Sequence, residues 1–168
     1  SLTSIMSSGN IIDPKLPPIS TDIDQEFIKV GLKYGSIKNE RNTIKLHIAS
    51  RMILMGESPY ALDVKMLAEQ VLYNLRERKG YNSQASPQHQ AVVLASGSRY
   101  EKLQSLETPT LIVHGRSDPF IPIEHGKKCA DIIPNAATLY VDGMGHDLPD
   151  MYVDIVAEKI IANILRAE

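Results

Sequence analysis

Residues 110–119 read Thr-Leu-Ile-Val-His-Gly-Arg-Ser-Asp-Pro, an apolar run that ends in a glycine and a polar turn. The run has the length and composition of a buried strand. Open α/β sheets carry their functional groups at the carboxyl ends of their strands, and Asp118 is expected at such an end. Because Asp is also an ordinary turn residue, the segment needs a partner before it indicates chemistry.

A second segment, residues 143–147, reads Gly-Met-Gly-His-Asp and follows the next predicted strand. Neighbouring parallel strands bring their loops to one sheet edge, so we expect Asp118 to accept a hydrogen bond from His146. The other ring nitrogen would then face a nucleophile as a general base. Gly143 and Gly145 are expected to let the loop turn sharply. The two segments predict the acid and base of a Ser-Asp-His triad, in that chain order.

The nucleophile of such a triad is missing from the sequence. A nucleophile elbow reads Gly-x-Ser-x-Gly between a strand and a helix, and this pattern occurs nowhere in the 168 residues. The segment Ala-Ser-Gly-Ser at 95–98 lacks both the strand and the first glycine. No metal-ligand spacing and no phosphate loop is present either, so we expect neither a metal nor a cofactor.

The composition indicates a soluble globular protein, with 43% apolar and 23% charged residues. A net charge of −2 gives no reason to expect nucleic acid or an anionic membrane as a partner. The single cysteine, Cys129, excludes an internal disulfide and fits a reducing compartment, so we predict a cytoplasmic location. No run is long enough to span a bilayer and no signal peptide is visible.

Apolar spacing predicts the secondary structure. Strands are expected over residues 1–7, 110–115 and 137–141, and helices over 20–35, 39–55, 59–78, 87–96, 123–133 and 149–166. In the second half, strands alternate with helices, which implies parallel strands joined by right-handed crossovers. The first three helices follow one another without a strand and resemble an inserted helical subdomain of about 60 residues.

Some burial can also be predicted. The helix over 87–96 is expected to pack against a sheet, because residues 91–95 are all apolar. The last helix is expected to bury an i, i+4 line of apolar side chains, widened by two neighbours. This stripe comprises Tyr152, Val156, Ile160 and Ile164, with Ile161 and Leu165 beside it.

The remaining histidines are assigned structural roles. His114 is expected to be buried and hydrogen-bonded, His125 to lie on a helix surface, His89 to be solvated and His47 to be packed or partly exposed. Met52, Met55 and Met66 are expected as helix core, with pocket lining as the alternative.

Residues 108–122 resemble the acid strand and loop of the α/β-hydrolase superfamily, and residues 141–149 resemble its histidine loop. Residues 1–7 resemble the strand that leads into its cap. The most similar branch contains aclacinomycin methylesterase and related carboxylic-ester hydrolases. The resemblance implies that Asp118 is the acid and His146 the base. It also implies a cofactor-free site beneath a cap, with a small-molecule ester as substrate.

By this resemblance the chain is the C-terminal portion of an α/β-hydrolase fold, containing the sixth to eighth strands and an all-helical cap. The expected domains are a strand and linker over 1–18, the cap over 19–80 and the hydrolase core over 81–168. The N-terminal half, with the nucleophile elbow and oxyanion loop, would be absent. We expect this chain alone to be inactive, and its exposed strand edge to favour self-association or pairing with the missing half.

Two alternatives remain open at this stage. The chain could be a non-catalytic binding or assembly module, derived from a split or degraded hydrolase. It could instead carry different chemistry on the same fold, since haloperoxidases and lyases use the same triad.

Overall fold

The structure is a computed structural model that describes residues 1–78, 80–82 and 85–166. Its centre is a three-stranded parallel sheet in the order β1 (Leu2–Ile5), β2 (Thr110–Gly115), β3 (Ala137–Val141). The predicted parallel arrangement is confirmed, with Leu2 paired to Thr110 and Leu111 to Ala137. The first strand is shorter than predicted, because Met6 adopts a left-handed φ of 46° that ends it.

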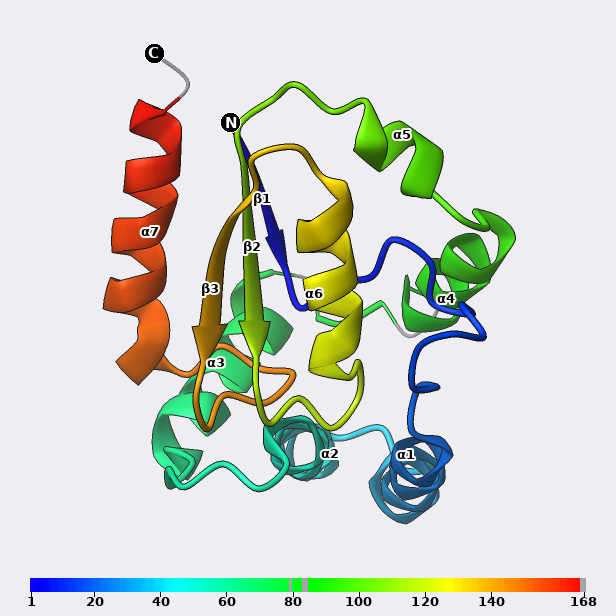
Figure 1. Cartoon of the computed structure of the whole chain (residues 1–168). Coiled ribbons are helices and arrows are strands. Elements are labelled where there is room, and N and C mark those ends of the chain that lie inside the picture. Colours follow the sequence, from blue (N-terminus) through cyan, green and yellow to red (C-terminus); the bar gives the residue numbers. More distant parts are fainter. Residues whose placement is uncertain (79, 83–84, 167–168) are drawn as a thin grey trace.

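Helices cover both faces of this sheet. Helix α6 (Ile123–Ile132) lies on one face and α7 (Val153–Leu165) on the other (Figure 1). Because side chains alternate along β2, its residues supply two separate core clusters. The cluster on the α7 side contains Leu111, Val113, Val141, Met144, Tyr152 and Val156. The cluster on the α6 side contains Ile112, Cys129 and Ile133.

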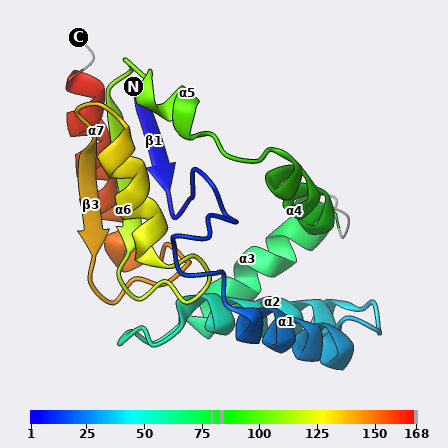
Figure 2. The same ribbon diagram turned by 45° about the vertical axis from the view of Figure 1, so that its right-hand side comes forward.

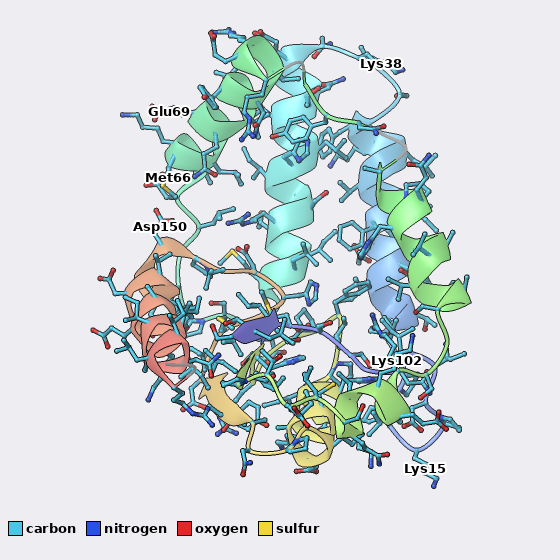
Figure 3. The ribbon with its side chains drawn as sticks, turned by 90° about the horizontal axis from the view of Figure 1, so that it is seen from above. Lys15, Lys38, Met66, Glu69, Lys102 and Asp150 are labelled. Atoms are coloured by element: carbon cyan, nitrogen blue, oxygen red, sulfur yellow. The ribbon has the colours of Figure 1, made fainter. Side chains whose placement is uncertain are left out.

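Three helices lie across the carboxyl ends of the strands: α1 (Thr21–Tyr34), α2 (Glu40–Met55) and α3 (Val64–Glu77) (Figures 1 and 2). Seen from above, α2 runs between the other two (Figure 3). Helix α3 begins later than predicted because Asp63 is its N-cap, and the Asp63 side chain accepts a hydrogen bond from Met66 N at 2.8 Å. The predicted division into domains at 18 and 80 remains a prediction, and residues 79 and 83–84 beside the second boundary lie outside the described residues.

The prediction that the fourth helix packs against the sheet is wrong. Helix α4 (Ala85–Ala95) is largely exposed, including 67% of Val92 and 50% of Leu94. Its apolar residues are consecutive and so point around the whole helix instead of along one face. A short helix, α5 (Tyr100–Gln104), was not predicted, because five residues are too few to show a periodicity.

The last helix buries the first part of the predicted stripe but not its end. A 3-10 turn (Asp150–Tyr152) precedes it, and Tyr152 and Val156 are buried as expected. Ile160 packs against the same core cluster, whereas Ile164 at the end of the line is 46% exposed, and its neighbours Ile161 and Leu165 are 57% and 60% exposed. Asn163, a polar residue, is 1% exposed and donates to the backbone oxygens of Leu2 (3.0 Å) and Pro109 (3.2 Å). The buried stripe therefore ends in a polar contact with the starts of two strands.

Among the helices of the described residues, none combines the length and the apolar character that crossing a membrane requires.

Candidate active site

The loops after β2 and β3 meet at one edge of the sheet, as the sequence predicts. Arg116 N donates to Val141 O at 2.9 Å, and Ser117 N donates to Met144 O at 3.1 Å. The approach is so close that a Cβ on Gly115 would overlap Met144 O. The two loops are thus held together by backbone contacts, independently of their functional side chains.

Asp118 lies in the first of these loops, with no exposed side-chain surface. Its Oδ1 accepts from Phe120 N at 2.9 Å and from Ile121 N at 2.8 Å, as in an Asx-turn. Its Oδ2 lies 2.8 Å from His146 Nδ1. Asp118 therefore serves both as a turn residue and as the partner of the imidazole.

The pKa of Asp118 is held below its ordinary value of 3.8. Burial opposes ionisation of the carboxyl, but hydrogen bonds from His114 and His146, the charge of His146 and the Ile121 N–H together outweigh it. An ionised Asp118 can only accept hydrogen bonds, so His146 donates from Nδ1. In the neutral ring, the Nε2 lone pair is then left available to take a proton.

The His146 side chain is partly buried, with 22% of it exposed. The Phe120 ring meets the imidazole edge-on, with ring centroids 5.0 Å apart. On the backbone side, His146 N donates to Leu54 O at 2.8 Å, a carbonyl in the last turn of α2. Among the described residues, no hydrogen-bond partner occupies Nε2, so the ring can act as a general base toward a group placed there.

The two glycines of the histidine loop have different roles. Gly143 has a φ of +72° and supplies the sharp turn that the sequence predicts. Gly145 is needed for space, because a Cβ there would overlap Leu54 O and lie 2.5 Å from Met55 O. The loop therefore packs directly on the end of α2, which the sequence did not predict.

His114 is buried and hydrogen-bonded, as predicted. Its Nε2 lies 2.9 Å from Ile121 O and 3.4 Å from Asp118 Oδ2, and its side chain has no exposed surface. Its Nδ1 is buried with no hydrogen-bond partner among the described residues. Since the Ile121 carbonyl can only accept, Nε2 carries the proton.

The prediction that His125 lies on a surface is wrong. His125 is 1% exposed, and its Nδ1 lies 2.8 Å from Ser8 Oγ while its Nε2 lies 2.9 Å from Pro17 O. The segment after β1 folds over the first turn of α6 and covers the ring. Within this pair Ser8 donates to His125, because Nε2–H must donate to the Pro17 carbonyl.

Of the other residues singled out in the sequence, Met55 lies beside the histidine loop, with its backbone oxygen next to Gly145. Cys129 is buried, and burial raises the pKa of its thiol. His47 stacks on Tyr81, with ring centroids 3.8 Å apart, and His89 is exposed. Met55 is 7% exposed, as expected for helix core, whereas Met52 is 61% exposed. In the described part of the chain, no group of three or more His, Cys, Asp or Glu residues could hold a metal ion.

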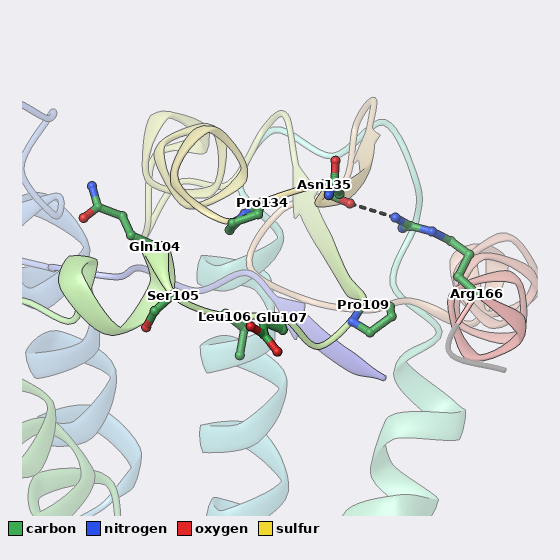
Figure 4. Close-up of a pocket in the computed structure, with 8 residues that line it drawn as sticks. All are labelled: Gln104, Ser105, Leu106, Glu107, Pro109, Pro134, Asn135 and Arg166. Atoms are coloured by element: carbon green, nitrogen blue, oxygen red, sulfur yellow. Dashed lines mark hydrogen bonds between the residues drawn. The ribbon is translucent and has the colours of Figure 1, made fainter.

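A cavity lies at the other end of the sheet. It has a volume of about 580 Å³ and is lined by residues that precede β2 and β3, together with Arg166 of the C-terminal segment (Figure 4). Since Asp118 and His146 follow these strands, the cavity is not part of their site. A second groove, of about 380 Å³, runs along β1 and includes Ser8 and Arg99.

Sequence comparison finds a matching family model and several related proteins. Residues 1–150 match the family model described as alpha/beta hydrolase fold. The bifunctional esterase/perhydrolase DCH of Acinetobacter calcoaceticus is 29% identical over 89 residues, which are 52% of this chain and 32% of that protein. Rhodomycin D methylesterase DauP of Streptomyces sp. (strain C5) is 25% identical over 153 residues, covering 77% of this chain and 51% of that protein. The matched part of this chain is thus about half the length of these relatives or less.

Structural comparison agrees on the fold. The meta-cleavage product hydrolase CumD of Pseudomonas fluorescens IP01 aligns with a TM-score of 0.60 at 16% identity, over 99% of this chain and 56% of that one. The predicted resemblance to α/β-hydrolases, including methylesterases, is confirmed by these matches. Since the family model covers most of its length, the chain belongs to the alpha/beta hydrolase fold family.

Proposed function

We propose that this chain is the C-terminal portion of a carboxylic-ester hydrolase, with Asp118 as the acid and His146 as the base of its triad. The observation that most directly supports this proposal is the 2.8 Å contact between His146 Nδ1 and the buried Asp118 Oδ2. The two residues follow neighbouring strands. Two facts support the C-terminal placement. The sequence has no Gly-x-Ser-x-Gly, and the chain spans about half the length of the relative DauP.

The proposed reaction uses a serine from the N-terminal half of the protein. Nε2 of His146 takes the serine proton as the oxygen attacks the ester carbonyl, and then gives it to the leaving alcohol. Water then attacks the acyl-serine. Nε2 of His146 takes the proton from this water and gives it to the serine oxygen as the acid is released. Asp118 holds Nδ1–H and stabilises the imidazolium that forms in each step. Helices α1–α3, across the strand ends, would act as a cap and select a small-molecule ester.

The N-terminal half would pair with the free edge of β1. This strand forms one border of the described sheet, and Leu2 at its start is 42% exposed. The groove along β1 offers apolar side chains, among them Ile5 and Leu103. An unpaired strand edge beside an apolar groove can form backbone hydrogen bonds with further strands. A second copy of the chain is the other candidate partner, and sedimentation of the purified chain distinguishes a dimer from a monomer.

Short-chain nitrophenyl esters and a serine-reactive phosphonate test the proposal. We expect neither hydrolysis nor labelling with the 168-residue chain alone. The full product of its reading frame should be labelled and active, and Asp118→Asn should reduce kcat by about 10⁴-fold. Labelling of a serine within the 168 residues, or an inactive full product, would overturn the proposal.

A second candidate function is peroxide-dependent oxidation on the same pair of residues. It is supported by the relative DCH, which is described as a bifunctional esterase/perhydrolase. The same full product, supplied with acetate, hydrogen peroxide and bromide, is tested for bromination of monochlorodimedone. Ester hydrolysis without bromination favours the first candidate.

A further inference from the structure

The end of helix α2 contacts the histidine loop through its backbone. The last carbonyls of a helix have no partner within the helix. One of them, Leu54 O, accepts the N–H of His146 at 2.8 Å. Gly145, the residue before, lies so close that no side chain fits between it and the carbonyls of Leu54 and Met55. His146, the proposed base, is therefore attached to the layer of helices α1–α3, called the helical layer below, as well as to the sheet.

A charged contact supplements this backbone attachment. Arg51 Nε, one turn before the end of α2, lies 2.6 Å from Asp147 Oδ2. The Arg51 side chain is 35% exposed, whereas that of Asp147 is only 7% exposed. The Nε–H is not aligned for a hydrogen bond, so the attraction is that of opposite charges. Within the described residues, Asp147 Oδ1 accepts only the neighbouring Leu148 N, at 2.9 Å.

Asp147 depends on this contact more than Arg51 does, because its side chain is the more buried of the two. A carboxylate that is nearly buried is costly unless a positive charge or enough hydrogen bonds compensate it. In the part of the chain that the structure describes, Arg51 is the cation within contact distance of the Asp147 carboxylate. Without Arg51, the carboxylate would regain water most easily if the loop moved outward, and His146 is the adjacent residue. Because the loop can move outward into water without unfolding the sheet, the effect should be largely local.

We propose that Arg51 is a positioning residue: through Asp147 it holds the histidine loop against the end of α2 and thereby sets the place of the His146 ring. This inference rests on the proposed function, in which His146 is the base. Its consequence is that helix α2 and the base form one unit. A displacement of the helical layer would carry His146 away from Asp118, so the site would be complete only with the layer in place.

The test uses NMR on the ¹⁵N-labelled 168-residue chain, without any ester. It records exchange of the His146 backbone amide, which reports the bond to Leu54 O, and the Nδ1–H resonance, which reports the bond to Asp118. With Arg51→Ala we expect exchange of this amide about tenfold faster or more, and a broadened Nδ1–H resonance. With Arg51→Lys, which keeps the charge, exchange should stay within about threefold of wild type.

A matched control and a suppressor make the test specific. Arg41, an exposed arginine in the first turn of α2, is replaced by Ala and should change neither signal. Adding Asp147→Asn to Arg51→Ala removes the uncompensated carboxylate, so the protection of the His146 amide should return. If Arg51→Ala prevents folding, the double variant and Arg51→Lys still decide the question.

Two results would overturn the inference. One is an Arg51→Ala chain in which both His146 signals match those of wild type. The other is a double variant that exchanges as fast as Arg51→Ala, since Arg51 would then act without Asp147. Because no turnover is measured, failure of the ester assay leaves this result unaffected. A positive ester assay with unchanged His146 signals would in turn reject only the positioning role.

Discussion

His114 and Asp118 face each other in the interior, with His114 Nε2 3.4 Å from Asp118 Oδ2 and neither side chain exposed. Together with the bond from His146, this places Asp118 between two imidazoles. The carboxylate is thereby kept ionised despite its burial, which is the state needed to orient His146. The stability of the protein should depend on this ionisation.

The first prediction concerns acid. The folded pKa of Asp118 lies below its ordinary 3.8, because hydrogen bonds outweigh burial. Such a group stabilises the fold above its unfolded pKa, and this contribution is lost as the pH falls through the folded pKa, below about pH 4. Asp118→Asn should therefore flatten the acid limb of the free energy of unfolding, measured by urea titration at several pH values. Asp154→Asn, an exposed control on α7, should keep the wild-type slope, and equal slopes in all three proteins would contradict the prediction.

The pairing of Asp118 with His146 could be predicted from the sequence because it follows from topology. Each residue comes directly after an apolar strand, and neighbouring parallel strands end at the same edge. The strands themselves are signalled by local apolar runs, and both are found at their predicted bounds. The catalytic roles of the two residues remain predictions.

Contacts between distant segments could not be predicted in this way. Arg51 and Leu54 read as ordinary helix residues, and nothing local indicates that the end of α2 touches the histidine loop. His125 reads as a surface residue because the cover comes from Ser8 and Pro17, far earlier in the chain. Asn163 interrupts an apolar stripe, yet it is buried because its amide donates to carbonyls at the starts of two strands.

The second prediction concerns the buried contact between Ser8 and His125. Replacing His125 by Ala removes a packed ring and leaves the Ser8 hydroxyl and the Pro17 carbonyl without their partner. We expect a loss of about 3 kcal/mol in the free energy of unfolding. His89→Ala, at an exposed position of α4, should change stability by no more than about 0.5 kcal/mol. Equal effects of the two changes in a urea titration would show that the Ser8 contact does not form.

The third prediction concerns Asn163, whose amide donates to Leu2 O and Pro109 O. Asn163→Leu keeps the volume but removes both of these hydrogen bonds, each worth about 1 kcal/mol, so we expect a loss of about 2 kcal/mol. Hydrogen exchange should localise the damage to the pairing of β1 with β2, where Leu2 N donates to Pro109 O. Lys159→Ala, on an exposed part of the same helix, is the control. If the β1 amides of Asn163→Leu exchange as in the Lys159→Ala protein, Asn163 does not anchor the strands.

The last prediction contrasts two glycines. A Cβ at Gly145 would overlap a backbone oxygen of α2, and backbone atoms cannot move aside as a flexible side chain can. Gly145→Ala should therefore cost about 2 kcal/mol or more and release the His146 N–H from Leu54 O. Gly31 lies inside α1, and nothing lies within 4 Å of the place that an added methyl group would take, so Gly31→Ala should stabilise by about 0.5–1 kcal/mol. Thermal unfolding measures the stability of both variants. We expect the melting temperature to fall for Gly145→Ala and to rise for Gly31→Ala. A neutral Gly145→Ala with a protected His146 amide would mean that the loop does not rest on α2.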